Sequence, residues 1–238
     1  MPGPRRRSAL IAQLLNEQAT SQAAILAELR RCLLDGGVPP GTPIPPDEVA
    51  AVFGVSRIPV REALKTLIGE GLVEHRPNAG YTVAKLTTAE LREMYLVREV
   101  LETAALNSAV SAATEDDHAR AREAHQALER AIDAGDVRGY HRESRRFHFA
   151  LVRPCGMHRL LTMFESAWNI TEPVQPMSHL SAADRATLHG DHGEMLAAFE
   201  GRDAAALLRV AAEHHRRLAI SLASLPRHTG LFRPAENI

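Results

Sequence analysis

The sequence predicts a mainly α-helical protein, with an N-terminal winged helix-turn-helix followed by an all-α helical bundle. Before residue 87 the apolar pattern indicates a helix, a helix-turn-helix and then a short hairpin. After residue 87 the pattern is helical throughout, and segments that contain Pro or Gly separate the helices. We therefore expect a tail with a short helix (1–20), the winged helix-turn-helix (21–86), the bundle (87–228) and a tail (229–238).

The composition is that of a globular protein in a reducing compartment. The 238 residues are 45% hydrophobic and 24% charged, and the net charge is -1. Residues 1–86 hold 10 Lys and Arg against 8 Asp and Glu, whereas the remainder holds 18 against 21. The two cysteines are too few for a disulfide framework, and no apolar run approaches the roughly 20 residues that span a bilayer. We therefore expect a cytoplasmic protein without membrane association.

The stretch from Gly54 to Leu67 predicts a short helix with an apolar back and a basic front. Ser56 is a suitable N-cap, and Pro59 falls in the first turn, where a missing N–H costs little. The apolar positions at helical spacing are Val60, Leu64 and Leu67. The positions on the outer side are Arg57, Arg61 and Lys65. A helix of this kind is suited to insertion in a DNA major groove.

The neighbouring segments complete a winged helix-turn-helix. A short helix is expected over 8–17 and a stronger one over about 21–35. Another helix begins near Pro46 and ends at Gly54, which permits the sharp turn of a helix-turn-helix. Its apolar face is expected to hold Val49, Ala50 and Phe53. Two short strands, over 73–75 and 81–84, enclose a turn.

From Thr87 onward the sequence predicts roughly six helices and no strand. Thr87 and Glu90 form a capping-box pattern at the start of a long helix that continues towards Ala113. The apolar positions of that helix are Leu91, Met94, Tyr95, Val97, Leu101 and Leu106. The other helices are expected at about 114–135, 137–152, 157–171, 182–200 and 204–224. Together they predict a helical bundle.

The first part of the chain closely resembles the GntR family of bacterial transcription regulators. The motifs that carry this resemblance are Pro40-Gly41-Thr42, Gly54-Val55-Ser56-Arg57, Pro59-Val60-Arg61-Glu62-Ala63-Leu64, Gly71-Leu72-Val73 and Gly80. The remainder resembles the ligand-binding half of the FadR branch of that family, called FCD. The signs of that half are Arg98 with Glu102, Phe147-His148, His192 before Met195-Leu196, Gly201-Arg202-Asp203, and His214.

The resemblance implies a DNA contact surface on the third helix and in the wing. The implied residues are Ser56, Arg57, Pro59 and Arg61, with Asn78 and Gly80 in the wing, and the basic face adds Lys65. Arg57 is the expected base reader, because a guanidinium can bond O6 and N7 of guanine together. Arg61 and Ser56 are the expected phosphate anchors. The wing is expected to contribute less, since Ala79 stands where the family often has Arg, and Pro45-Pro46 replaces a frequent Ser-Glu.

The resemblance also implies a metal site in the bundle. In the FCD pattern three histidines and an Asp bind the ion, and the matching residues here are His148, His192 and His214. Ser144 occupies the Asp position, four residues before His148, and a hydroxyl is a poorer ligand than a carboxylate. Three imidazoles can hold zinc or nickel and leave positions open. The alternative is that these are ordinary core histidines around a metal-free cavity.

Eight other histidines match no ligand position and are expected at the surface. They are His118, His125, His141, His158, His179, His189, His215 and His228. The resemblance directs Arg98 to the carboxylate of an effector, whereas the alternative is a salt bridge from Arg98 to Glu102. Asn169 could line the same cavity, while Trp168 is expected to pack in the core.

The sequence therefore predicts a transcription regulator that is not an enzyme. It would bind a palindromic double-stranded DNA operator as a homodimer and act as a repressor that a small carboxylate metabolite releases. One alternative is a regulator with a metal-free pocket for an acyl ligand. The other is a metal-dependent enzyme built on the three histidines.

Overall fold

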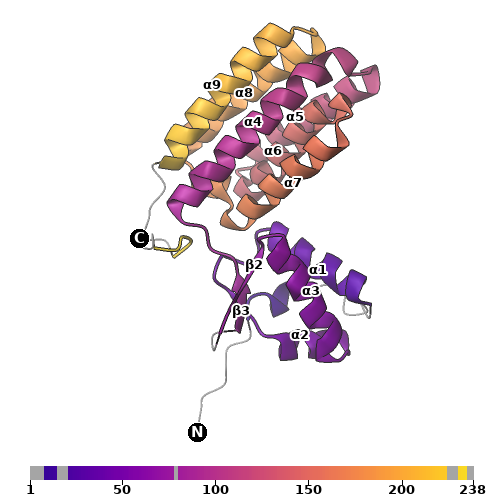
Figure 1. The fold of residues 1–238 in the computed structure, drawn as a ribbon. Coiled ribbons are helices and arrows are strands. Elements are labelled where there is room, and N and C mark those ends of the chain that lie inside the picture. Colours follow the sequence, from indigo (N-terminus) through magenta and orange to yellow (C-terminus); the bar gives the residue numbers. More distant parts are fainter. Residues whose placement is uncertain (1–7, 15–20, 78–79, 224–229, 235–238) are drawn as a thin grey trace. The chain divides into compact units, whose positions relative to one another are not determined.

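The computed structural model describes residues 8–14, 21–77, 80–223 and 230–234. The protein divides into two compact units (Figure 1). The first unit is built mainly from the chain up to Ala89, and the second is built from Glu90–Trp168 and the helices that follow Gln175. This division fits the change in sequence pattern near residue 87.

Three α-helices of the first unit follow the predicted order. They are α1 (Gln22–Leu34), α2 (Pro46–Phe53) and α3 (Arg57–Gly69). Ser21 caps α1 by accepting a hydrogen bond from the backbone N–H of Ala24. Gly54, between α2 and α3, has a φ of 63°, so its lack of a Cβ makes the tight turn possible. The predicted helix-turn-helix is confirmed.

The helix expected over 8–17 is not formed as predicted. The described part contains only a 3-10 turn, η1 (Ile11–Gln13), and residues 15–20 lie outside the described residues. Leu14 at its end is already extended. Isolated helices this short are marginal because the nucleation of a first turn is costly. Leu10 and Leu14 are buried instead as anchors on the core of the first unit.

The wing is a three-stranded antiparallel sheet with the order β1-β3-β2. Strands β2 (Val73–Arg76) and β3 (Gly80–Val83) confirm the predicted hairpin, and Arg76 pairs with Gly80 beside the turn. Gly80 has a φ of 80°, which favours glycine. Strand β1 (Pro43–Ile44) was not predicted, because two residues that include a proline give no strand pattern.

The core of the first unit explains the spacing seen in the sequence. Val60, Leu64 and Leu67 of α3 are each 0% exposed. They pack in one cluster with the apolar faces of α1 and α2, including Val49, Ala50 and Phe53. Removing these side chains from water supplies most of the stability of so small a domain. The opposite face of α3 is left to solvent.

The second unit is a helical bundle that contains six α-helices among the described residues (Figure 1). Its helices are α4 (Thr88–Ala112), α5 (Glu115–Asp133), α6 (Val137–Val152), α7 (His158–Thr171), α8 (Ala182–Glu200) and α9 (Ala204–Ala223). Thr114 and Asp117 form a reciprocal capping box at the start of α5. Helix α5 packs against α6 and α8, and α8 packs against α9.

Short 3-10 segments join the later helices of the bundle. They are η2 (Arg153–Cys155), η3 (Glu172–Val174) and η4 (Pro176–His179). The predicted number of helices is confirmed for the described part of the chain, and so are their approximate bounds. No helix of the described residues is long and apolar enough to cross a membrane.

The middle of helix α4 buries charged side chains and exposes aliphatic ones. Its charged residues Arg98 and Glu102 are 3% and 0% exposed, whereas Leu96 and Val100 are 59% and 60% exposed. Val97 was expected on the buried face and is 38% exposed, so that expectation was wrong. A helix that buries charge and exposes aliphatic side chains has a polar site on one side and an unusual apolar surface on the other.

Candidate DNA interface and histidine cavity

The outer face of α3 carries the basic side chains expected to meet DNA. Arg57, Arg61 and Lys65 are all exposed. Arg57 forms an ion pair with Asp47 of α2, and Lys65 pairs with Glu62 at 2.8 Å. Both pairs lie in water and are therefore weak, so a phosphate or a base edge can replace the carboxylate.

Ser56 occupies the predicted N-cap position, but its side chain makes no capping hydrogen bond. The expectation that its hydroxyl satisfies the first turn of α3 was therefore wrong. The first-turn N–H groups of α3 and the exposed Ser56 hydroxyl remain available to an anion at this helix start. Pro59 lies in that first turn as predicted and has no N–H to leave unsatisfied.

Ile58 is a residue of this face that sequence reasoning missed. It lies between Arg57 and Pro59 at the start of α3 and is 72% exposed. An aliphatic side chain so exposed on a recognition helix can contact the C5-methyl group of thymine. The sequence did contain a signal for Ile58, because this apolar residue does not share the helical spacing of the buried residues of α3. In the wing, Gly80 is half-buried, whereas Asn78 and Ala79 lie outside the described residues.

Three buried histidines meet inside the bundle as the sequence predicted. His148 of α6, His192 of α8 and His214 of α9 are each at most 2% exposed. Nε2 of His148 lies 3.2 Å from Nε2 of His192. One nitrogen from each ring lies within 4.8 Å of the others. Two nitrogens bound to one zinc ion at about 2.0–2.1 Å would be about 3.3 Å apart, so this spacing fits coordination.

Two buried carboxylates hold the outer side of this histidine cluster. Oε1 of Glu102 lies 2.5 Å from Nδ1 of His148, and its Oε2 lies 3.0 Å from Nε2 of His215. Oδ2 of Asp191 lies 3.5 Å from Nδ1 of His214, and Arg217 pairs with the other oxygen. The carboxylate bonded to Nδ1 of His148 directs the other nitrogen of that ring inward, as metal sites require, whereas Asp191 and Nδ1 of His214 are in contact without a hydrogen bond.

The protonation states of these groups also suit metal binding. Burial, reinforced by His214 and His148, holds the pKa of His192 well below its usual value. Burial lowers the pKa of His214 to about 4, although Asp191 opposes the shift. Burial alone would raise the pKa of Glu102, but His148 and His215 hold that pKa well below its usual value. His192 and His214 are therefore neutral near pH 7 and keep a free lone pair.

Ser144 and Arg98 complete the small cavity around the histidines. Its lining side chains are Tyr95, Arg98, His141, Ser144, His148, Trp168, Met177, Leu188, His192, His214 and Leu218. The free space is about 10 Å³, close to the least that holds one water molecule. Ser144 faces the site from one turn before His148, but its hydroxyl does not replace a carboxylate. The cavity fits an ion, and a larger ligand requires side chains to move.

Arg98 lies between two aromatic rings. Its guanidinium carbon is 3.2 Å from the centroid of Trp168 and 4.3 Å from the centroid of Tyr95. Stacking of this kind fixes the plane of the guanidinium. Both oxygens of Glu102 face histidines, so the alternative of an Arg98–Glu102 salt bridge does not describe this site. Trp168 is buried as expected, and Asn169, next to it, is half-buried.

Several histidines that were expected at the surface are buried. His118, His141 and His215 are 3%, 4% and 5% exposed, so that expectation was wrong for them. His215 points away from His214, as adjacent helix positions must, but it reaches Glu102 rather than solvent. Only tertiary packing reveals this role. His158 and His179 are exposed as expected, whereas His125 and His189 are half-buried and His228 lies outside the described residues.

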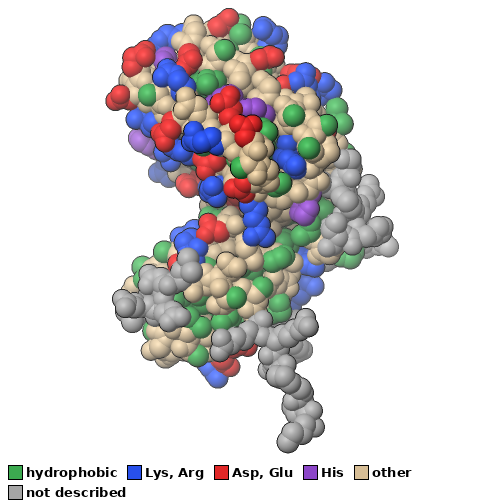
Figure 2. Space-filling view, turned by 180° about the vertical axis from the view of Figure 1, so that it is seen from behind, with side chains coloured by type: hydrophobic (Ala, Val, Ile, Leu, Met, Phe, Trp, Pro, Cys, Tyr) green, Lys and Arg blue, Asp and Glu red, His purple; other side chains and the backbone are tan. Residues whose placement is uncertain are grey.

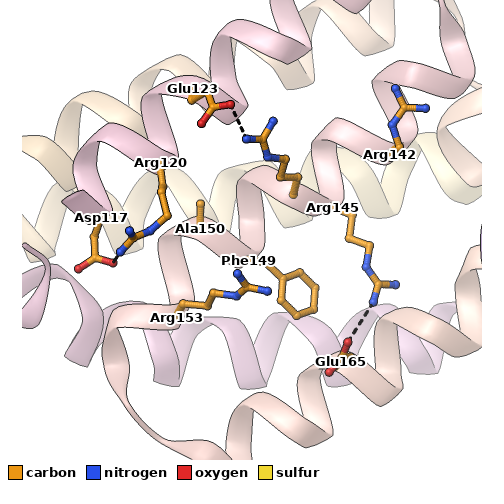
Figure 3. A pocket seen from close by; sticks show the side chains of 10 residues that line it. Asp117, Arg120, Glu123, Arg142, Arg145, Phe149, Ala150, Arg153 and Glu165 are labelled. Atoms are coloured by element: carbon orange, nitrogen blue, oxygen red, sulfur yellow. Dashed lines mark hydrogen bonds and ion pairs between the residues drawn. The ribbon is translucent and has the colours of Figure 1, made fainter. Parts of the chain in front are cut away.

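A larger cavity of about 820 Å³ opens on the bundle surface among α5, α6 and α7 (Figure 3). Its charged lining residues are Asp117, Arg120, Glu123, Arg142, Arg145, Arg146, Arg153 and Glu165. In Figure 3, Arg120 turns to Asp117 and Arg145 turns to Glu165, and these pairs are 2.5 and 3.7 Å apart. Acidic and basic side chains also alternate over the bundle face in Figure 2. Such paired charges are typical of a solvated surface.

A winged helix with an exposed basic recognition helix, followed along the chain by a helical bundle with an internal polar cavity, defines the class of winged-helix DNA-binding proteins. Comparison with known families agrees. The family of bacterial regulatory proteins called gntR matches residues 21–83, and the FCD domain matches residues 93–217. The chain therefore belongs to the GntR family of transcription regulators and carries an FCD domain.

Individual relatives support this assignment. The HTH-type transcriptional repressor RspR of Escherichia coli is 27% identical over 208 residues, which cover 87% of this chain and 91% of RspR. A probable D-xylose utilization operon transcriptional repressor of Paenarthrobacter nicotinovorans is 33% identical over 138 residues, which cover 58% of each chain. The solved structure of E. coli McbR/YncC has a TM-score of 0.75 and 25% identity over 85% of this chain and 96% of that one. These relatives are named as transcription regulators.

In protein freed of metal by a chelator, acidification from about pH 7 to about pH 5 should destabilise the bundle. The pKa of His214 is 6.5 in its ordinary state and about 4 here, so the unfolded chain takes up the proton first. Each pH unit below 6.5 then costs about 1.4 kcal/mol, or about 2 kcal/mol by pH 5, and His192 acts in the same direction.

Urea unfolding followed by the fluorescence of Trp168, the one tryptophan, measures this loss. His214→Gln should flatten the dependence on pH. A wild-type stability that does not change over this range would contradict the assignment of neutral buried histidines.

Proposed function

We propose that this chain is a repressor of the FadR branch that binds a palindromic operator as a homodimer. A small carboxylate effector, bound with a divalent metal in the histidine cavity, would release the operator. The observation that carries the proposal is the pairing of an exposed basic α3 with three buried histidines, at least two of them neutral, in one chain. The relatives RspR and the D-xylose operon regulator, both named as repressors, support the direction of control.

On DNA, Arg57 reads a guanine and exchanges its bond to Asp47 for O6 and N7 of the base. Ile58 contacts a thymine methyl group beside it. Arg61, Ser56 and the free N–H groups at the start of α3 hold phosphates, and Lys65 adds a phosphate contact further along the helix. Gly80 and Asn78 bring the wing to the minor groove.

Arg57→Ala should weaken binding to the operator by about 10–100-fold, because one bidentate contact to a base is worth about 1–3 kcal/mol. Binding to unrelated DNA should change much less. Footprinting and gel shifts on the gene's own upstream region, at fixed salt, measure both. Arg92→Ala is the matched control, because it removes an exposed arginine from α4 instead. An Arg57→Ala protein that keeps its preference for the operator would refute this base contact.

The proposed dimer uses the outer face of α4. Leu96 and Val100 lie one turn apart on that face and are more than half exposed, which is unusual for aliphatic side chains at helical spacing. A twofold axis at such a surface pairs two recognition helices with the two halves of a palindrome. Sedimentation of the wild type and of Arg57→Ala tests this, and a monomer at the concentrations that bind DNA would exclude it.

The residues of the cavity fit a divalent metal. His148, His192 and His214 would hold the ion, and Zn or Ni suits three imidazoles. When bound, the ion would offer a positive charge and an open position to a carboxylate. Ser144 contributes no charge, so binding should be weaker than with the usual Asp. Glu102 and Asp191 keep His148 and His214 aligned from behind.

Glu102→Gln should lower the affinity for Zn by about 10–100-fold, since the partners behind metal-bound histidines have effects of this size. Competition with a chromophoric chelator measures the affinity without reference to DNA binding. Glu99→Gln on the same helix is the control, because Glu99 is half-buried and does not line the cavity. Equal affinity in Glu102→Gln and wild type would show that this carboxylate does not support a metal site.

The effector carboxylate is expected to meet Arg98, whose guanidinium is held between Tyr95 and Trp168. Because the present free space is only about 10 Å³, binding requires the lining side chains to rearrange. The effector would therefore bind the rearranged conformation more tightly than the present one. Such a difference in affinity is needed if the effector is to release the DNA. Asn169, which was expected to line the same cavity, is not among its lining residues.

A thermal-shift screen of small carboxylates should find compounds that stabilise the wild type by mass action and stabilise Arg98→Gln much less. Arg92→Gln is the control. The alternative regulator, with a metal-free acyl pocket, would bind no Zn after metal loading and would respond to acyl ligands in the same screen. Carboxylates that stabilise Arg98→Gln and wild type equally would move the effector away from this arginine.

A further inference from the structure

A second cluster of ligating side chains lies on the bundle, outside the histidine cavity. His125 and Glu129 come from α5, where residues four apart share a face, and His189 comes from the packed neighbour α8. None of these residues lines the cavity of His148, His192 and His214. No sequence pattern marks this cluster, because its members come from two helices that are far apart along the chain.

The geometry of the cluster brings three ligand atoms together. Nδ1 of His125 lies 3.8 Å from Oε1 of Glu129. The rings of His125 and His189 are stacked, with centroids 4.7 Å apart and planes at 17°. One ligand atom from each of the three side chains lies within 4.8 Å of the other two. Ligands of one zinc ion are about 3.3 Å apart, so side-chain rotations that move atoms by about 1.5 Å close the site.

An ordinary pair of surface histidines would satisfy its nitrogens with water. Here Nε2 of His125 and Nδ1 of His189 are both buried with no hydrogen-bond partner among the described residues, although Glu129 reaches solvent with 52% of its side chain exposed. Burial and the neighbouring His125 lower the pKa of His189, while Glu129 and Asp133 oppose that shift. Both histidines of the cluster thus hold a buried nitrogen without a partner among the described residues.

We propose that His125, Glu129 and His189 form a second binding site for a divalent transition metal ion such as zinc or nickel. Two imidazoles and one carboxylate are a ligand set that these ions accept, and the exposed side of Glu129 leaves room for water ligands. The ion would join α5 to α8 and stabilise the folded bundle. Helix α8 carries both sites, since His189 precedes His192 by one turn and the two rings are 6.3 Å apart.

Counting bound ions on the full chain tests the site. The protein is freed of any affinity tag and of metal, dialysed against Zn²⁺ and analysed by mass spectrometry for ions per chain. We expect about two ions in the wild type and about one in His189→Gln and in Glu129→Gln. His158→Gln, which removes an exposed histidine of α7, should keep two. Circular dichroism confirms that each variant is folded.

The outcomes separate this site from the histidine cavity. One ion per chain that His148→Gln removes and that His189→Gln and Glu129→Gln retain would overturn the second site. One ion that His189→Gln removes and His148→Gln retains would support the second site and reject a metal in the cavity. No ion in the wild type would reject both.

Discussion

The bundle depends on the contacts that the buried carboxylate of Glu102 makes with His148 and His215. A carboxylate at 0% exposure is costly unless charged or polar partners surround it. Here the partners come from α6 and α9, so the one side chain of α4 ties three helices together. Removing either histidine would leave a buried charge with too few partners. Because burying the charge of Glu102 is costly, the imidazole rings of His148 and His215 must stay beside its carboxylate.

The same contact determines what faces the cavity. Because Glu102 occupies Nδ1 of His148, the Nε2 lone pair of that ring is directed towards His192. Arg98, one turn earlier on α4, is stacked against Trp168 at the edge of the same space. Near the cavity the buried side of α4 thus carries polar groups, and the aliphatic Leu96 and Val100 are exposed on the opposite side. One helix therefore carries both a cavity-facing polar segment and an exposed aliphatic surface.

Much of this fold could be predicted from local signals in the sequence. Val60, Leu64 and Leu67 indicated the buried face of α3, and Ser21, Gly54 and Thr114 lie at helix ends that their own chemistry favours. What failed depended on distant partners. The hydroxyl of Ser56 leaves the cap open, and the two residues of β1 form a strand only because β3 lies beside them. His118, His141 and His215 are buried by helices that a periodicity pattern cannot place together.

In the site, too, the features that depend on distant partners could not be predicted from local signals. The histidines of the cavity were predicted because a resemblance supplied their positions, whereas the alternative of an Arg98–Glu102 salt bridge is not formed and no local pattern pointed to Asp191. An i,i+4 spacing made Arg98–Glu102 the natural pair, since local neighbours are all that a sequence shows. The packed structure pairs Glu102 differently. Its fully buried carboxylate is stabilised by two histidines that are themselves buried, while the guanidinium of Arg98 is held by aromatic rings.

Ser144 matters for the charge of the site because it is neutral where the family pattern has an Asp. With an Asp at this position, a carboxylate would offset the charge of a bound ion. With Ser144, the negative charge of the site stays behind the histidines, on Glu102 and Asp191, where His148 and His215 contact Glu102 and Arg217 pairs with Asp191. An ion held by neutral His192 and His214 would keep its positive charge, and Arg98 adds another. With such an ion bound, the cavity would favour an anion, and it would do so more strongly with Ser144 than with the Asp of the family pattern.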